Sequence, residues 1–355
     1  MSANLRSIRQ NSKDTSADAP VSHSLNLIEA VNLALHRAML DDSKVVILGE
    51  DVGVNGGVFR ATDRLRAEFG LKRVMDTPLA ETMIAGMSVG MAAQGLRPVA
   101  EIQFMGFIFP AMEQLVCHAA RLRNRTRGRL NCPLVIRAPF GGGIHAPEHH
   151  SESVEALFAH IPGLNVVIPS SPQRAYGLLL SAIRSNDPVV FLEPKRIYRY
   201  SKSDVIDNGL GLPIGKSFII KPGKDITLIT WGAMLIETME AAQTAEKSGI
   251  SCEVIDVASI SPMDHETLLH SVQKTGRCCI IHEAARHCGV GAEIAATLSE
   301  QLFNSLKAPI GRITGYDTVM PYFKNEAYYF PTVEKITGII RETVAYGQQG
   351  NAIKH

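Results

Sequence analysis

Residues 74–95 form the segment that most constrains how this chain can fold. They read V-M-D-T-P-L-A-E-T-M-I-A-G-M-S-V-G-M-A-A-Q-G, and Pro78 ends a short apolar run because proline cannot donate to a strand ladder. From residue 80 to residue 93 the side chains are small or apolar, and Glu81 carries the only charge. Such a helix is expected to be buried on most sides. Gly86, Gly90 and Gly95 each cost about 1 kcal/mol relative to alanine, so they predict that another segment packs close to this backbone.

Glu81 stands at the start of this predicted helix and has two interpretations. A carboxylate at a helix N-terminus is stabilised by the helix dipole without any further role. Alternatively, the acid is held in an apolar pocket as a proton partner for a bound ligand. The helix contains no basic residue that could neutralise the acid, which favours the second interpretation.

Composition excludes several classes of function. The 355 residues are enough for about two domains. A net charge of +1 gives no electrostatic reason to bind nucleic acid or membrane surfaces. No apolar run approaches the roughly 20 residues of a membrane-spanning helix. The six cysteines form no C-x-x-C pair, which indicates reduced core thiols in a cytosol-like compartment. Asp14 and Asp18 argue against a mitochondrial transit peptide, so we expect a cytoplasmic, bacterial location rather than a mitochondrial matrix.

Apolar strands alternate with amphipathic helices along the chain, which predicts an α/β fold of two domains, each a mainly parallel sheet covered by helices. Residues 1–22 are polar and aperiodic, so we expect a disordered tail there. The expected first domain covers residues 23–200, a turn-rich linker covers 201–223, and the second domain covers 224–345. Within the first domain we expect an aromatic turn at 105–109 and a helix at 111–125 that ends in a basic cluster. That cluster is interpreted as a solvated helix end or a subunit contact.

Residues 139–153 form a glycine- and proline-rich loop that carries three histidines: P-F-G-G-G-I-H-A-P-E-H-H-S-E-S. His145, Glu148, His149 and His150 could bind a metal ion. However, the H-E-x-x-H pattern is absent and Pro147 prevents a helix. The other interpretations are a loop of surface histidines and a catalytic imidazole, whose pKa near neutrality suits proton transfer.

Several motifs, in the same order, resemble those of the β subunits of thiamine-diphosphate-dependent first components of 2-oxo acid dehydrogenases. They are G-E-D-V-G, G-G-V-F-R-A-T, D-T-P-L-A-E with its small-residue helix, H-S-x-S, and K-T-G-R…H-E-A…G-x-G-A-E. The resemblance covers roughly residues 25 to 345. It implies a transketolase-like pyrimidine-binding domain followed by a transketolase-type C-terminal domain.

The resemblance also implies roles for individual residues. Glu81 is expected to bind the aminopyrimidine nitrogen of thiamine diphosphate, with Leu79, Gln103 and Phe107 around that ring. His150 falls on the histidine that serves proton transfer and acyl transfer to lipoamide. Glu152 replaces the glutamine or aspartate of relatives, and the additional His149 leaves open which imidazole acts.

A potassium site is implied as well, at Leu134, Ala182, Ile183, Ser185 and Asp187, although Ser185 stands where relatives carry aspartate. His282 and Glu283 follow a predicted strand of the second domain. We expect structural or interface roles for them, because the family uses this domain for subunit contacts and for docking the dihydrolipoyl acyltransferase core.

The chain contains no G-D-G motif, which in thiamine enzymes holds the diphosphate through Mg²⁺. The resemblance therefore implies that an α subunit supplies the magnesium and diphosphate site in a heterotetramer of two α and two β chains. The expected activity is oxidative decarboxylation of pyruvate, with a branched-chain 2-oxo acid as the alternative. A metal-dependent hydrolase using the histidine loop and a non-catalytic scaffold subunit remain as other classes.

Overall fold

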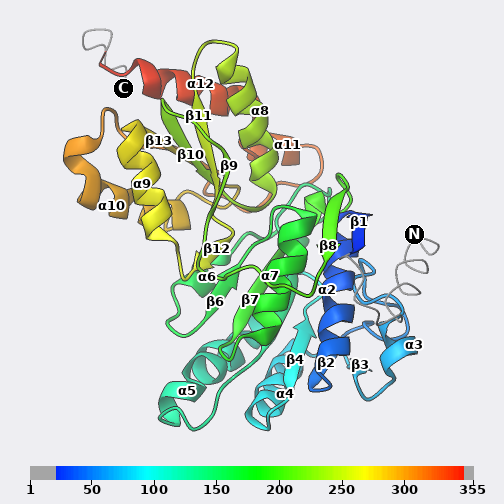
Figure 1. The fold of residues 1–355 in the computed structure, drawn as a ribbon. Coiled ribbons are helices and arrows are strands. Elements are labelled where there is room, and N and C mark those ends of the chain that lie inside the picture. Colours follow the sequence, from blue (N-terminus) through cyan, green and yellow to red (C-terminus); the bar gives the residue numbers. More distant parts are fainter. Residues whose placement is uncertain (1–20, 348–355) are drawn as a thin grey trace.

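The computed structural model describes residues 21–347. The polar tail expected at residues 1–22 lies outside this range except for Val21 and Ser22, which belong to a strand. The chain folds into two lobes, coloured blue to green and yellow to red in Figure 1. Each lobe contains one main sheet, so the predicted α/β fold with two mainly parallel sheets is confirmed.

The first sheet has seven strands in the order β12-β6-β7-β5-β4-β2-β3, and all neighbours are parallel except β12 and β6. Its strands are β2 (Val45–Gly49), β3 (Val74–Asp76), β4 (Arg97–Glu101), β5 (Val135–Phe140), β6 (Asn165–Val167), β7 (Val189–Pro194) and β12 (Ser259–Ser261). The strands β2, β5 and β7 are buried along their whole length, as expected for a parallel sheet covered on both faces. Strand β12 comes from the second half of the chain, and it covers the edge that β6 would otherwise expose.

The helices of the first lobe are α2 (Leu27–Asp41), α3 (Leu65–Phe69), α4 (Glu81–Ala93), α5 (Leu122–Arg125), α6 (Glu155–Ala159) and α7 (Pro172–Arg184). Helices α2 and α7 pack side by side, as Figure 1 shows. Asn26 and Glu29 form a capping box at the start of α2, and Ser171 caps α7 just before a proline. Local sequence therefore specifies where both helices begin.

The segment at 201–223, expected as a linker, contains two strands. Strand β8 (Ser203–Asp207) pairs with β1 (Val21–Leu25) in a separate antiparallel ribbon. Strand β9 (Phe218–Lys221) joins the second sheet. The connection between the lobes is therefore fastened to both of them.

The second sheet has the order β14-β13-β10-β11-β9, with only β9 antiparallel. Its other strands are β10 (Ile226–Thr230), β11 (Cys252–Asp256), β13 (Cys278–Ile281) and β14 (Gly311–Ile313), and the helices of this lobe are α8 (Leu235–Glu246), α9 (His265–Thr275), α10 (Val290–Leu302), α11 (Glu326–Tyr329) and α12 (Val333–Ala345).

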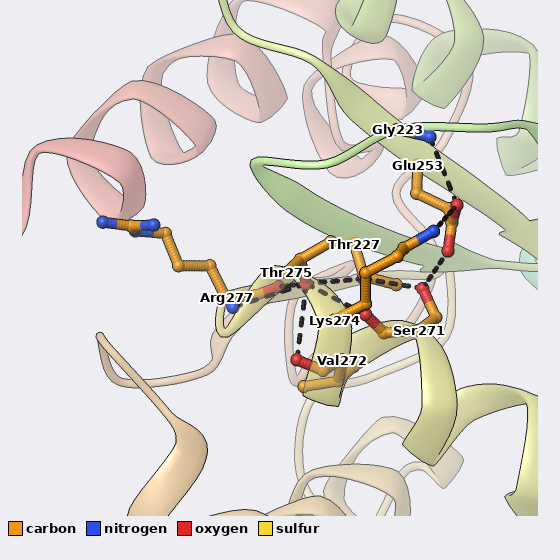
Figure 2. A network of polar contacts seen from close by, with 8 residues as sticks. All are labelled: Gly223, Thr227, Glu253, Ser271, Val272, Lys274, Thr275 and Arg277. Atoms are coloured by element: carbon orange, nitrogen blue, oxygen red, sulfur yellow. Dashed lines mark hydrogen bonds and ion pairs between the residues drawn. The ribbon is translucent and has the colours of Figure 1, made fainter.

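A buried polar network fastens α9 to this sheet, as Figure 2 shows. The hydroxyl of Thr227 on β10 contacts Ser271 at 2.8 Å and Thr275 at 2.9 Å. Ser271 and Lys274 then donate to the carboxylate of Glu253 on β11. Burial opposes ionisation of Glu253, but these hydrogen bonds outweigh it and lower the pKa of the carboxyl group.

Residues 105–125 differ from the expected turn and single helix. They form a 3₁₀ helix η1 (Met105–Ala111), a π turn η2 (Gln114–His118), a second 3₁₀ turn η3 (Ala119–Arg121) and the short α5. Pro110 lies inside η1, where its missing N–H and fixed φ disfavour a regular α-helix. Arg121 and Arg125 donate to the carbonyl groups of Val116 and Cys117, so these two arginines of the basic cluster cap the irregular helix.

All six cysteines are free. Four are buried as predicted, whereas Cys117 and Cys288 are exposed, which corrects the expectation of core thiols at those two positions. No helix within residues 21–347 combines the length and the apolar character needed to cross a membrane.

A buried arginine joins three neighbouring strands near their carboxyl ends. Arg137 on β5 donates to Glu101 on β4 at 2.8 Å and to both carboxylate oxygens of Glu193 on β7 at 2.7 and 3.0 Å. Tyr198 adds a hydrogen bond to Glu193 at 2.7 Å. Burial raises the pKa of Glu101, although Arg137 opposes the shift. The three charges are tolerated only because each is paired.

We predict that Arg137→Met destabilises the chain by about 3 kcal/mol or more, because it leaves two buried carboxylates without their cation. The loss should shrink as pH falls, because burial raises the pKa of Glu101 in the folded state, so this carboxyl group is protonated there at a higher pH than in the unfolded chain. Urea unfolding at pH 8 and pH 5 measures both effects. Arg184→Met is the control, because Arg184 pairs with Asp41 on the surface and should contribute less than about 1 kcal/mol. Equal losses for the two variants would contradict the prediction.

Candidate functional site

The predicted site residues follow the carboxyl ends of parallel strands of the first sheet. Glu81 comes after β3, Gln103 after β4, and the histidine loop at 141–150 after β5. The carboxyl ends of parallel strands meet at one edge of a sheet, where ligands of α/β proteins bind. The fold therefore brings together residues that are separated along the chain.

Glu50 was not singled out from the sequence, but it belongs to this edge. It directly follows β2 and is buried, and its Oε1 atom has no hydrogen-bond partner among the described residues. Burial raises the pKa of Glu50, and the nearby charges of Glu81 and Asp51 raise it further. A buried carboxyl group without a partner is available to a ligand. Its position after a buried strand in G-E-D-V-G was the signal that could have identified it.

Helix α4 is less buried than its sequence predicted. Of the residues of α4, only Ile84, Ala85, Ser88 and Ala92 are buried by other parts of this chain. Met87 on the other side is 39% exposed, and Leu79 just before the helix is 81% exposed. The exposed side of α4 is as apolar as the buried side, and no other described segment of this chain covers it to explain that apolar composition.

The three glycines of this segment have different explanations. Gly95 lies beyond the end of α4 with φ of +88°, a conformation that glycine adopts readily. Gly86 has the side chain of Gln114 near the position of a Cβ atom, at 3.4 Å. At Gly90 nothing lies within 4 Å of that position, so the close contact predicted from the glycines is not made there within the described part of the chain.

Aromatic rings surround His150. Its ring centroid lies 4.5 Å from that of Phe104 and 5.1 Å from that of Phe107, with nearly perpendicular planes. Phe59 from the G-G-V-F-R-A-T motif extends the cluster, 5.5 Å from Phe104. Edge-to-face contacts of this kind restrict the orientation of a ring. Gln103 lies near this cluster in sequence and donates to Asp51 at 3.3 Å.

Gly106 is required for this arrangement and was also missed. A Cβ atom at this position would lie 2.0 Å from the carbonyl oxygen of His149. The backbone of the histidine loop therefore packs against helix η1 at Gly106, where only glycine fits. The G in M-G-F was visible in the sequence, but the loop that contacts it lies more than 40 residues away.

The charge state of His150 depends on its surroundings. Burial lowers the pKa of His150, and the positive charges of His149 and Lys195 lower it further, while Glu148 opposes the shift. Its Nδ1 atom is buried without a partner among the described residues. The imidazole is therefore neutral near pH 7 and can accept a proton.

Lys195 is an unexpected buried cation near this loop. It is 3% exposed, and its Nζ atom has no hydrogen-bond partner in the described part of the chain. Burial lowers the pKa of Lys195 to about 8, although Glu283 and Glu326 oppose the change.

The histidines of the loop point to different partners. His145 contacts Glu326 at 2.7 Å and stacks edge-to-face on Phe323, whereas His149 and His150 face phenylalanines. Among residues 21–347, no three His, Cys, Asp or Glu side chains lie together as metal ligands. The donor set that the metal interpretation needs is therefore not assembled by the described loop.

The residues of the implied potassium site already have partners. Arg97 Nη1 donates to the carbonyl oxygens of Ile183 and Ser185 at 3.1 and 2.9 Å. The carbonyls of Leu134 and Ala182 accept backbone N–H groups, and Asp187 pairs with Arg123. A potassium ion would have to take the place of Arg97 at two of these oxygens.

Comparisons with known families agree with the two halves of the fold. Residues 23–201 match "Transketolase, pyrimidine binding domain" and residues 215–336 match "Transketolase, C-terminal domain". The chain is 50% identical to the pyruvate dehydrogenase E1 component subunit beta of Acholeplasma laidlawii, covering 90% of this chain and 97% of that protein. It is 47% identical to the protein of the same name from Staphylococcus aureus, covering 91% and 99%.

A solved structure titled "Split gene transketolase, inactive beta4 tetramer" has the same fold. Its TM-score is 0.75 at 23% identity, and the match covers 91% of this chain and 99% of that chain.

We predict that Lys195→Met raises the pKa of His150, because the change removes a nearby positive charge while keeping a side chain of similar length. NMR titration of the protein labelled at its histidine rings measures this, with the His150 signal assigned through His150→Gln. Lys247→Met, an exposed change at the end of α8, is the control and should leave the titration unaltered. A lower or unchanged pKa in Lys195→Met would contradict the prediction.

Proposed function

The chain belongs to the family of pyruvate dehydrogenase E1 component β subunits, and on this premise we propose that it decarboxylates pyruvate oxidatively together with an α subunit and passes the acetyl group to lipoamide. The observation that carries the proposal is the convergence of Glu81, Phe107 and His150 at one sheet edge, beside an apolar helix face that this chain leaves open. The protein is then an oxidoreductase subunit whose site is completed by its partner.

The cofactor of this reaction is thiamine diphosphate. When bound, it supplies the carbon nucleophile that adds to the 2-oxo group and takes up the electrons left by departing carbon dioxide. The residues present fit its aminopyrimidine end, since Glu50 and His150 both carry buried polar atoms without partners in the described structure. A buried polar atom without a partner is costly unless a ligand satisfies it.

Glu81 would hold the proton that the aminopyrimidine nitrogen needs. It begins α4 at the sheet edge, and its charge acts on Glu50 nearby. Gln103 and Phe107 would line the ring from the segment after β4, and Leu79 would contact it from the segment before α4. An aromatic ring in such a position orients a flat ligand by stacking, which is worth about 1 kcal/mol beyond its burial.

His150 would accept and return a proton during acyl transfer to lipoamide. Its lowered pKa supports this role, because a neutral imidazole is the form that accepts a proton. His150 rather than His149 is favoured as the acting residue because its ring packs more closely, at 4.5 and 5.1 Å from two phenylalanine rings against 5.7 and 6.2 Å for His149. In addition, its Nδ1 atom is buried without a partner among the described residues.

The α subunit would hold the diphosphate through Mg²⁺, because this chain lacks the G-D-G motif. The proposed assembly is a heterotetramer of two α and two β chains that docks on a dihydrolipoyl acyltransferase core in the bacterial cytoplasm. The open apolar side of α4 supports a partner at this position. The potassium site stays a prediction, and binding there requires that Arg97 release two carbonyl groups.

We predict that Glu81→Gln lowers kcat of the reconstituted complex by roughly 100-fold or more, because a proton-transfer group of this kind contributes about 10²–10⁴-fold. The assay measures decarboxylation of pyruvate and of 3-methyl-2-oxobutanoate, with and without thiamine diphosphate and Mg²⁺. Glu240→Gln, an exposed change on α8, is the control.

Turnover of pyruvate by the wild-type complex only when both chains and the cofactor are present supports the proposal. Preference for the branched-chain acid would reassign the substrate. Full activity of Glu81→Gln would favour the scaffold role.

We predict that Gly90→Leu weakens assembly with the α subunit by about tenfold or more, the equivalent of about 1.4 kcal/mol. The new side chain has open space in this chain, so it would obstruct only a partner that packs on α4. Sedimentation or light scattering of the mixed subunits measures the effect. Gly338→Leu is the matched control, because Gly338 also lies within a helix and has nothing within 4 Å. Normal assembly of Gly90→Leu would exclude a close contact at this face.

A further inference from the structure

The loop of residues 141–153, which carries His150, is held by the second half of the chain. It leaves the first sheet at the end of β5 and contacts the segment after β13 and the start of α11. Two buried carboxylates from those segments, Glu283 and Glu326, make these contacts. They lie 141 and 183 residues away from the loop glycines to which they bond.

Glu283 joins both ends of the loop. Its Oε1 atom accepts a hydrogen bond from the N–H of Gly142 at 3.3 Å and another from the hydroxyl of Ser153 at 2.8 Å. The two ends of the loop are also bonded directly to each other, because the N–H of Gly141 donates to the carbonyl of Glu152 at 2.9 Å. One carboxylate oxygen therefore fixes the separation of the two ends.

Glu326 holds the middle of the same loop. Its Oε1 atom accepts from the N–H of Gly143 at 2.6 Å, and its Oε2 atom accepts from the N–H of His145 at 2.9 Å and contacts His145 Nδ1 at 2.7 Å. His145 has φ of +59°, which a residue with a side chain rarely adopts. Hydrogen bonds to an ionised acceptor are among the stronger ones in proteins, so Glu326 can maintain this conformation.

The first two of the three glycines follow from this close approach, whereas a Cβ atom on Gly143 would lie 2.1 Å from Arg196 Cδ of the first lobe. A Cβ atom on Gly141 would lie 2.1 Å from Glu283 Oε1, and one on Gly142 would lie 2.6 Å from Met320 Cε. Both of those neighbours belong to the second half of the chain. The loop therefore lacks side chains at the points where the second lobe contacts it.

The opposite side of the loop rests on the first lobe. The carbonyl of His149 lies over Gly106, and the ring of His150 packs on Phe104 and Phe107. The position of the imidazole is thus set by two supports, one from each lobe. The phenylalanine rings restrict the orientation of the imidazole ring, and the two carboxylates restrict the conformation of the backbone that carries it.

On the basis of the function proposed above, we propose that Glu283 and Glu326 are positioning residues for His150. They hold the loop so that the imidazole stays at the carboxyl edge of the first sheet. The C-terminal half of the chain thereby takes part in the reaction through the placement of a catalytic group, in addition to any role in subunit contacts. Misplacement of a reacting group by about 1 Å can lower a rate by about 100-fold.

The test compares Glu326→Gln, Glu283→Gln and Ser153→Ala in the reconstituted complex, with Glu240→Gln as control. We expect kcat for pyruvate to fall roughly 10- to 100-fold in both glutamine variants, while KM for pyruvate and the affinity for thiamine diphosphate stay within about twofold of wild type. Hydrogen exchange followed by mass spectrometry should show faster exchange in the peptide covering 141–153. Ser153→Ala should show the same pattern to a smaller extent, and because it removes only one hydroxyl group it tests the idea even if a glutamine variant fails to fold.

Either of two results would overturn the proposal. One is full kcat in variants whose loop exchanges faster, and the other is a loss of kcat while exchange of the loop is unchanged. An inactive wild-type complex would instead refute the function proposed above, because the wild-type chain retains both carboxylates.

Discussion

The ion pairs of Arg137 with Glu101 and Glu193 are the contacts on which the sheet edge of the candidate site depends. They join Arg137 in the middle of β5 to Glu101 and Glu193 at the carboxyl ends of β4 and β7, inside the sheet where no water compensates an unpaired charge. Each of these strands then leads directly into a segment of the site: Gln103 follows Glu101 by two residues, the loop at 141 follows Arg137 by four, and Lys195 follows Glu193 by two. Holding these three strands together therefore fixes where those segments begin.

The site is polar at the sheet edge and apolar beside it. Glu50, Glu81 and His150 are the ionisable groups at this edge, and in the proposed function Glu81 and His150 exchange protons, while α4 presents Met87 and the backbone of Gly90 outward. An apolar helix with one open face is expected to gain stability when a partner covers it. The site shared between two subunits that we propose would account for both the missing diphosphate motif and the open face.

Much of the fold followed from local patterns. The alternation of apolar strands with helices predicted both parallel sheets, and capping residues marked the starts of α2 and α7. Residues 105–125 were not predicted correctly, because Pro110 extends the expected turn into a 3₁₀ helix and the expected helix at 111–125 is broken into short π, 3₁₀ and α turns that helical spacing does not distinguish from a regular helix. The extent of burial of α4 was also overestimated, since composition indicates that a face will be covered but not whether the cover belongs to the same chain.

The sequence by itself determined the two α/β halves and the chemical groups at the strand ends, because strand and helix periods and turn residues act over short distances. Local patterns singled out Glu81 and the histidine loop, and the resemblance of H-S-x-S to a known family then pointed to His150 within that loop. Only the tertiary structure decided that Glu50 is buried beside Glu81, that Gly106 receives the backbone of His149, and that two distant acids hold the histidine loop. Those contacts join segments 31 to 183 residues apart, and no periodicity or spacing in a single sequence reports which distant residues will meet.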